Sequence, residues 1–391
     1  MHAPCKKGVP NETDCPFLAR SPLFQKGLSL SFFASQRVSD EDKESLFAVT
    51  PSLFLNPTVG VTGINASGKT CLLNAVTFAI RLLNNEAINH IPEKTILSGA
   101  SEVTILSYFF HEGFLYELRT LIASEVDALG QERFRITDEA LRAKKLAKLI
   151  NKKTLLIFDD SKTVLVRDNK ETFLPDDTSI MISFNTREKT QLVLADMLAS
   201  TNFNVPILPE AVPSEDLLLL DSSIESIEQE SGMRSPKVRL KFHGKPEILC
   251  GQGDLFNVLS SGTIRGITLL FLTRQILKTG GILVLDEIEN HLNRELVATL
   301  VRLFLDTEVN TQGATLLFST HYPELLDIFK RNDSLYRVKN ESGCIVAEPF
   351  SNLIQRNDIK KSVLYESGSL GGTAPKYEAY IQFKKSLKRL K

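Results

Sequence analysis

An eight-residue glycine-rich loop constrains the fold of this chain more than any other sequence feature. It reads Gly63-Ile64-Asn65-Ala66-Ser67-Gly68-Lys69-Thr70 and fits the pattern G-x-x-x-x-G-K-[ST] without a mismatch. A mostly β-branched run, 59–62, precedes the loop, and an amphipathic segment, 69–83, follows it. We therefore predict a strand–loop–helix unit whose glycines let successive backbone N–H groups point at phosphate oxygens beside the N-terminus of the helix.

The same pattern predicts which side chains of this phosphate loop (Gly63–Thr70) would bind ATP and Mg²⁺. Lys69 is expected to reach the β and γ phosphates, and the hydroxyl of Thr70 to ligate Mg²⁺. The remaining predicted contacts to the nucleotide come from the loop itself and the residue after it: Gly63, Asn65, Ala66, Ser67, Gly68 and Cys71. ATP and Mg²⁺ are accordingly the cofactors that the sequence predicts.

Two carboxylates follow an apolar strand far along the chain. The run 282–285 reads Ile-Leu-Val-Leu, and Asp286 and Glu287 come directly after it. Because the chain also has a phosphate loop, Asp286 is expected to complete the Mg²⁺ shell and Glu287 to polarise an attacking water as general base. A strand end capped by two surface acids is the plainer alternative, which the presence of the loop makes less attractive.

A small-residue turn lies between the loop and this strand. Leu259-Ser260-Ser261-Gly262-Thr263, called here the signature turn, opens an apolar helix predicted over 264–277. A helix N-terminus with free N–H groups and small hydroxyls favours anions, so Ser260, Ser261 and Gly262 are predicted to bind nucleotide. Taken alone, the turn would be an ordinary serine N-cap.

One histidine stands at the end of another predicted core strand. His321 follows the apolar run 315–319 and is expected to bond a γ-phosphate or to position water beside Glu287. Lys69, Glu287 and His321 are thus the predicted catalytic residues, whereas a histidine that only caps its strand is the alternative for His321.

The order of these motifs resembles the head of ABC-type ATPases, as found in transporters, SMC proteins and OLD-like proteins. This resemblance implies an α/β fold, a P-loop NTPase of ABC-ATPase head type, with an inserted helical or mixed lobe. It also implies a homodimer or higher homo-oligomer in which Ser260 and Gly262 complete the ATP site of the partner head. Transporters usually carry Gly-Gly-Gln where this chain has Ser261-Gly262-Thr263, and this difference argues against a transporter.

A narrower resemblance concerns compact bacterial AAA-type ATPases of abortive-infection antiphage systems, of AbiL or RloA type. It rests on the N-x-S-G-K-[ST] loop, on Ser260-Ser261-Gly262-Thr263, and on the segment from Tyr365-Glu366-Ser367-Gly368 to Gly371-Gly372-Thr373-Ala374-Pro375. The resemblance implies a Mg²⁺-dependent ATP hydrolase that senses infection or controls a separate effector, expected to be a nuclease. A DNA-repair or chromosome-maintenance ATPase of SMC or OLD-like type, stimulated by DNA, is the alternative; a kinase using the same loop would not need the signature turn.

The chain of 391 residues is predicted to comprise one head interrupted by an insertion. An irregular N-terminal extension is assigned to 1–26, the nucleotide-binding core to 27–135 and 236–391, and the inserted lobe to 136–235. Within these parts we expect strands at 28–33, 53–55, 154–158, 163–166 and 179–184, a hairpin of 103–110 with 114–121, and a basic helix over 138–153. The stretch 190–233 holds eight acids and no Lys or Arg, which predicts an acidic, partly helical lobe.

Charge and composition exclude some broad classes. Lys and Arg number 46 against 47 Asp and Glu, so the chain as a whole is not a strongly basic nucleic-acid coat. Two basic segments, 142–153 and the tail 376–391, could contact DNA or RNA. The alternative for 142–153 is a solvated helix face, and the alternative for 376–391 is a terminal helix packed on the head. No apolar run reaches the ~20 residues that a membrane-spanning helix needs. The five cysteines are scattered along the sequence, which favours reduced thiols over disulfides. We therefore expect a cytoplasmic protein without a membrane contact.

Overall fold

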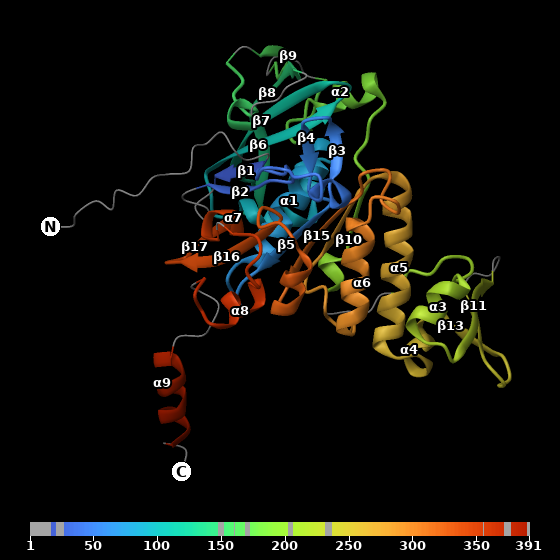
Figure 1. The fold of residues 1–391 in the computed structure, drawn as a ribbon. Coiled ribbons are helices and arrows are strands. Elements are labelled where there is room, and N and C mark those ends of the chain that lie inside the picture. The colour runs from blue at the N-terminus through green and yellow to red at the C-terminus, as the bar shows by residue number, and fades with distance from the viewer. Residues whose placement is uncertain are drawn as a thin grey trace.

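A parallel sheet forms the centre of the molecule in the computed structural model, which describes residues 17–20, 27–147, 152–159, 161–168, 173–201, 206–230, 237–354, 356–370 and 377–388 (Figure 1). Its strand order is β10 (Leu194–Asp196), β14 (Ile282–Leu285), β15 (Thr315–Thr320), β5 (Thr58–Thr62), β16 (Leu335–Glu341) and β17 (Cys344–Pro349). Neighbouring strands from β10 to β16 are parallel, and only β17 runs antiparallel. Every residue of β5 and β15 is buried, as expected for strands covered on both faces.

A second, antiparallel sheet lies above the first in Figure 1, and helix α1 (Lys69–Leu83) packs between them. Its order is β2 (Leu28–Leu30), β1 (Phe17–Arg20), β6 (Glu102–His111), β7 (Phe114–Val126), β8 (Glu132–Lys145) and β9 (Lys162–Val166). One cluster of buried apolar side chains joins α1 to strands of both sheets. The predicted helix 69–83, the β6–β7 hairpin and the strand at 163–166 are confirmed.

Two long helices, α5 (Ser261–Thr279) and α6 (Arg294–Leu305), pack against the other face of the central sheet through a second apolar cluster. Beyond α5 lies a small lobe of three strands, β11 (Ile224–Glu230), β12 (Lys237–Phe242) and β13 (Ile248–Gly251), with α3 (Ser214–Leu220) and α4 (Leu255–Val258). The remaining elements are β3 (Phe47–Thr50), β4 (Leu53–Leu55), α2 (Met181–Glu188), α7 (Phe350–Leu353), α8 (Lys361–Glu366), α9 (Tyr377–Lys388) and short 3₁₀ turns.

The predicted basic helix over 138–153 is wrong, because residues up to Lys145 belong to β8. Buried positions alternate along this strand, but a bulge opposite Leu121 and Ile122 shifts their phase. Pairing with β7 over most of its length overrides the helical propensity of a segment rich in Lys, Arg and Ala. Residues 148–151 lie outside the described part.

Two predicted strands are also replaced by other structure. Residues 181–184 begin helix α2, and its N-cap Ile180 packs with Met181 and Phe184 in one buried apolar cluster. Residues 154–158 form turns, with the N–H of Ile157 donating to the carbonyl of Thr154 at 3.2 Å. Both segments are short apolar runs, whose periodicity cannot separate a strand from a buried turn or helix.

The described strands cross the predicted domain limits. Position 135 lies inside β8, and β10, within the predicted insertion, belongs to the central sheet. Residues 17–20, within the predicted irregular extension, form β1 between β2 and β6. The rest of 1–26 lies outside the described residues.

The predicted tail helix is present as α9, but it does not pack on the head. Its Tyr380 and Phe383 are 56% and 62% exposed, and Figure 1 shows α9 standing apart from the rest. No helix within the described ranges has the length and the apolar character of a membrane-crossing segment.

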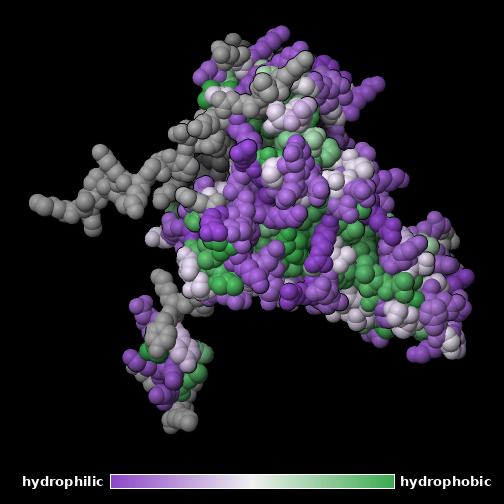
Figure 2. Space-filling view, in the orientation of Figure 1, coloured by the Kyte–Doolittle hydropathy of each residue, from purple (hydrophilic) through white to green (hydrophobic). Residues whose placement is uncertain are grey.

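The small lobe carries a group of exposed apolar side chains, visible at the lower right of Figure 2. Leu218 and Leu219 lie on α3, and Phe256 and Val258 lie on or at the end of α4. We call these four residues the apolar lobe patch. Because the chain continues from Val258 directly into the signature turn, Phe256 and Val258 lie close in sequence to that turn.

Candidate active site

The phosphate loop connects the end of β5 to the start of α1, as the sequence predicts. Gly68 has a φ of 103°, a conformation that residues with a Cβ rarely adopt. At Gly63 the constraint is contact, since a Cβ there would lie 2.3 Å from the carbonyl oxygen of Val338 on β16. These two glycines therefore allow the chain to turn tightly against the sheet before the helix begins.

A cavity of about 370 Å³ opens over this loop. Its lining residues are Asn65, Ala66, Ser67, Gly68, Lys69, Thr70, Cys71, Glu287 and His321. Glu287 follows β14 and His321 follows β15, so residues more than 200 positions apart meet because the carboxyl ends of parallel strands share one edge of the sheet. The structure thus brings the predicted loop, the predicted base and the predicted histidine into one site.

Lys69 and Ser67 are polar residues of the loop that line the cavity. The ammonium of Lys69 donates to the carbonyl oxygens of Gly63 at 3.0 Å and Ile64 at 3.2 Å. Burial lowers the pKa of Lys69, and the negative charges of Asp286, Glu287 and Glu289 oppose this shift. The hydroxyl oxygen of Ser67 is buried and has no hydrogen-bond partner among the described residues. A buried ammonium at this cavity fits phosphate oxygens, which accept charge-assisted hydrogen bonds from it.

The two predicted Mg²⁺ ligands lie in contact. The hydroxyl of Thr70 donates to Oδ2 of Asp286 at 2.6 Å, and Asp286 is buried. A hydroxyl and a carboxylate are hard oxygen donors of the kind that Mg²⁺ prefers, so this pair fits the ion. On its other side Asp286 accepts a hydrogen bond from the hydroxyl of Ser319, which in turn accepts the N–H of Glu287 at 2.8 Å. Ser319 therefore orients both acids.

Replacing Ser319 with Ala is expected to weaken Mg²⁺ binding and to lower the stability of the protein. The variant leaves the N–H of Glu287 without its acceptor and releases Asp286 from one donor. We expect a several-fold rise in the Mg²⁺ concentration for half-maximal ATP hydrolysis, and a loss of about 1–3 kcal/mol in the free energy of unfolding. A Mg²⁺ titration and urea unfolding measure the two effects, with the exposed Ser367→Ala as control. An unchanged Mg²⁺ midpoint would show that Ser319 does not orient Asp286.

Glu287 sits in a turn that we call the acid turn (Glu287–His291). Its φ of 47° is unusual for a residue with a side chain, and the structure around it must hold it there. Oε1 of Glu287 lies 3.6 Å from Nε2 of His321. The backbone N–H of His321 donates to Oε1 of Glu289 at 2.6 Å. The Glu287 carboxylate is 42% exposed at the cavity, where it can accept a proton from water.

The signature turn lies at the N-terminus of α5, as predicted, but outside this cavity. Ser260 is the N-cap, and its hydroxyl oxygen accepts the N–H of Thr263 at 3.0 Å. Residues 260–262 are not among those that line the cavity. A Cβ on Gly262 would lie 2.6 Å from the carbonyl oxygen of His291, so the signature turn packs on the acid turn.

Cys71, which the sequence predicts to contact nucleotide, lines the cavity, but its thiol is not activated as a nucleophile. Burial raises the pKa of its thiol to about 11. The thiol is therefore protonated at neutral pH and is a poor nucleophile.

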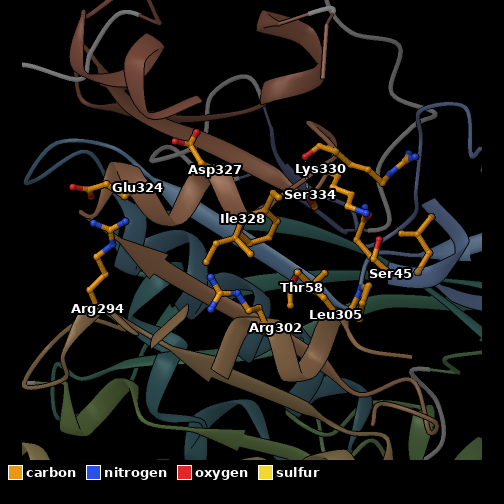
Figure 3. Close-up of a pocket in the computed structure, with 15 residues that line it drawn as sticks. Ser45, Thr58, Arg294, Arg302, Leu305, Glu324, Asp327, Ile328, Lys330 and Ser334 are labelled. Carbon is orange, nitrogen blue, oxygen red and sulfur yellow. Dashed lines mark hydrogen bonds between the residues drawn. The ribbon is translucent and has the colours of Figure 1, made fainter. Parts of the chain in front are cut away.

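A larger cavity, of about 450 Å³, lies at the opposite end of β5 (Figure 3). Thr58 begins β5 there, Arg302 projects from α6, and Asp327 comes from the 3₁₀ turn after β15. Arg331, in its wall, is bound by Asp42 at 3.2 Å and Asp333 at 2.6 Å. This cavity shares no residue with the one over the phosphate loop, so it is not part of the candidate active site.

Some residues that shape the site were not predicted. Ser319 and Glu289 bond the acids and His321, and Asn290 anchors the acid turn by donating to the carbonyl of Thr201 at 2.6 Å. A polar residue ending an otherwise apolar strand was a usable signal for Ser319. The partners of Asn290 and Glu289 lie far away in sequence, and no local pattern marks them.

Comparison with known proteins agrees with this geometry. A family model described as "AAA domain, putative AbiEii toxin, Type IV TA system" matches residues 59–327, from β5 through the acids and His321. A search of curated proteins gives no match. Since the family match spans more than half of the 391 residues, the chain belongs to this family of AAA domains, P-loop ATPases related to the ATPases of abortive-infection systems.

Proposed function

We propose that the protein is a Mg²⁺-dependent ATP hydrolase whose ATP-driven dimerisation controls a separate effector in antiphage defence. The observation that carries the hydrolase proposal is the single cavity that joins the phosphate loop to Glu287 and His321, with the Thr70–Asp286 pair at its side. A phosphate cradle, an oxygen pair for the metal and a carboxylate facing the same space are the parts that ATP hydrolysis requires.

In the proposed mechanism the phosphates of ATP lie along the loop. Lys69 exchanges its bonds to the Gly63 and Ile64 carbonyls for bonds to the β and γ phosphates. When bound, Mg²⁺ would be held by Thr70 and Asp286 and would neutralise phosphate charge. Glu287 accepts the proton of the attacking water, and His321, 3.6 Å from it, orients that water at the γ phosphate.

Dimerisation is supported by two features of the signature turn. Its residues lie outside the chain's own cavity, so they are available for the nucleotide of a second copy. Phe256 and Val258 of the apolar lobe patch, directly before it in sequence, are exposed, and exposed apolar groups often mark protein interfaces. We infer a homodimer with two ATP molecules between the heads.

The defence role is supported by the family description, which names a toxin–antitoxin system. We infer that the opening and closing of the dimer switches a separate protein, with a nuclease as the favoured effector. The second candidate is a DNA-stimulated maintenance ATPase, and α9 favours it. There exposed Lys384, Lys385 and Lys388 lie beside exposed Tyr380 and Phe383, a mixture suited to nucleic acid. By contrast, Arg142 and Lys144 of β8 contact groups within the protein.

Phosphate release by the purified chain tests the function. We expect free phosphate to form from ATP with Mg²⁺ and to cease in excess EDTA, and we expect ATP to shift the monomer to a dimer in light scattering. Duplex DNA should change the rate less than two-fold. Transfer of phosphate to an acceptor would contradict hydrolysis, whereas strong stimulation by DNA that falls steeply with salt would favour the maintenance ATPase.

A further inference from the structure

Arg265, on α5 shortly after the signature turn, is the largest fully buried side chain in the part of the chain that the structure describes. Its Nη1 donates to the carbonyl oxygens of Ser200 at 3.4 Å and Thr201 at 3.3 Å. Its Nε–H is buried and has no acceptor among the described residues. Burial lowers the pKa of Arg265, and the negative charge of Glu287 opposes this effect. Burying a cation whose partners are mainly neutral carbonyls costs desolvation free energy, so a functional role for Arg265 would explain its position.

The carbonyl of Thr201 joins Arg265 to the acid turn. The same oxygen accepts the side-chain N–H of Asn290 at 2.6 Å, and the backbone N–H of Asn290 donates to the carbonyl of Glu287 at 2.8 Å. A second contact runs in parallel, because Gly262 packs against the carbonyl of His291. The start of α5 and the acid turn are thus linked twice, once through polar groups and once through direct packing.

We propose that Arg265 is a positioning residue that couples the signature turn of each subunit to Glu287 of the same subunit. The inference rests on the proposed function, in which the signature turn binds the nucleotide of the partner. When that contact moves α5, Arg265 shifts the Thr201 carbonyl, and Asn290 carries the shift to Glu287. Each subunit's base then responds to ATP in the other subunit's site.

Two features, one in the acid turn and one at Arg265, favour a response to such a movement of α5. Glu287 holds a positive φ, so its conformation depends on the groups around it. The Nε–H of Arg265 has no acceptor among the described residues. A movement of α5 that brings an acceptor to this N–H would therefore be energetically favoured. The coupling should therefore appear as cooperativity in ATP, without loss of nucleotide binding.

Steady-state hydrolysis by Arg265→Met, Asn290→Ala and the double variant tests the coupling. Met keeps much of the buried volume but removes the charge and its donors. We expect each single variant to lower kcat about ten-fold or more, to reduce the Hill coefficient for ATP from above 1 to about 1, and to leave the Kd for ATP within two-fold. The double variant should be no worse than the poorer single one, because both act through the Thr201 carbonyl.

The matched control is Arg274→Met on the same helix, which removes an arginine bound to Asp216 near the surface and should keep the wild-type kcat and Hill coefficient. Should Arg265→Met fail to fold by circular dichroism, Asn290→Ala decides the matter alone. The coupling would be overturned by unchanged kcat and cooperativity in Asn290→Ala, or by a double variant whose fold-loss in kcat is the product of the two single losses. Either result leaves the proposed function intact as long as the wild type hydrolyses ATP. Absence of turnover in the wild type would overturn the function itself.

Discussion

Replacing Lys69 with Ala is expected to abolish measurable ATP binding. In the structure this ammonium is buried at the loop, where the carbonyls of Gly63 and Ile64 are its hydrogen-bond acceptors among the described residues, and Lys69 lines the cavity. Charge-assisted bonds to phosphate are worth about 1.5–3 kcal/mol each. Loss of two such bonds should raise the Kd for ATP by at least about 100-fold, or about 2.7 kcal/mol. Isothermal titration calorimetry measures this directly.

The control for this experiment is Lys330→Ala, an exposed lysine at the larger cavity beyond the other end of β5. Its Kd should match the wild-type value, which separates a local effect from a general loss of positive charge. If Lys69→Ala bound ATP with the wild-type Kd, the cavity over residues 63–70 would not be the phosphate site.

Replacing Glu287 with Gln should separate binding from hydrolysis. The amide is nearly the same size as the carboxylate but cannot accept a proton from water. We expect kcat to fall by about 10²–10⁴-fold while ATP still binds. Because hydrolysis would be the step that opens the dimer, the ATP-bound dimer should accumulate. Single-turnover kinetics and light scattering in ATP measure the two consequences.

Glu295→Gln is the matched control, since Glu295 is an exposed carboxylate in the first turn of α6. It should hydrolyse ATP at the wild-type rate. Wild-type turnover in Glu287→Gln would mean that another group, with His321 the nearest choice at 3.6 Å, takes the proton.

The sequence predicted the central part of the fold well because its signals there are local. The loop needs glycine at Gly68, where φ is 103°, and at Gly63, where contact with the sheet is close. The segments 282–285 and 315–319 are largely apolar runs of strand length. The β8 segment was mistaken for a helix because its pairing with β7 and its bulge are decided by a distant strand. Likewise, nothing within residues 194–196 indicates that they extend the central sheet beside β14.

For the site, the side chains that line the cavity were predictable and those that hold them were not. Glu287 and His321 stand at strand ends, and parallel strands place such ends together. The acid turn, however, depends on Thr201 offering its carbonyl to two donors from different elements. A carbonyl exists at every residue, so its role becomes visible only when the chain has folded.

The position of α1 between two sheets links ATP to the lifetime of the whole protein. Its buried residues form one cluster with strands of both sheets, and its first turn carries the phosphate loop. Unfolding of either sheet would expose this cluster and dismantle the loop, so a ligand that binds only the intact loop protects both sheets from proteases. Cellular ATP concentration would then set how much of the protein survives turnover as well as how fast it works.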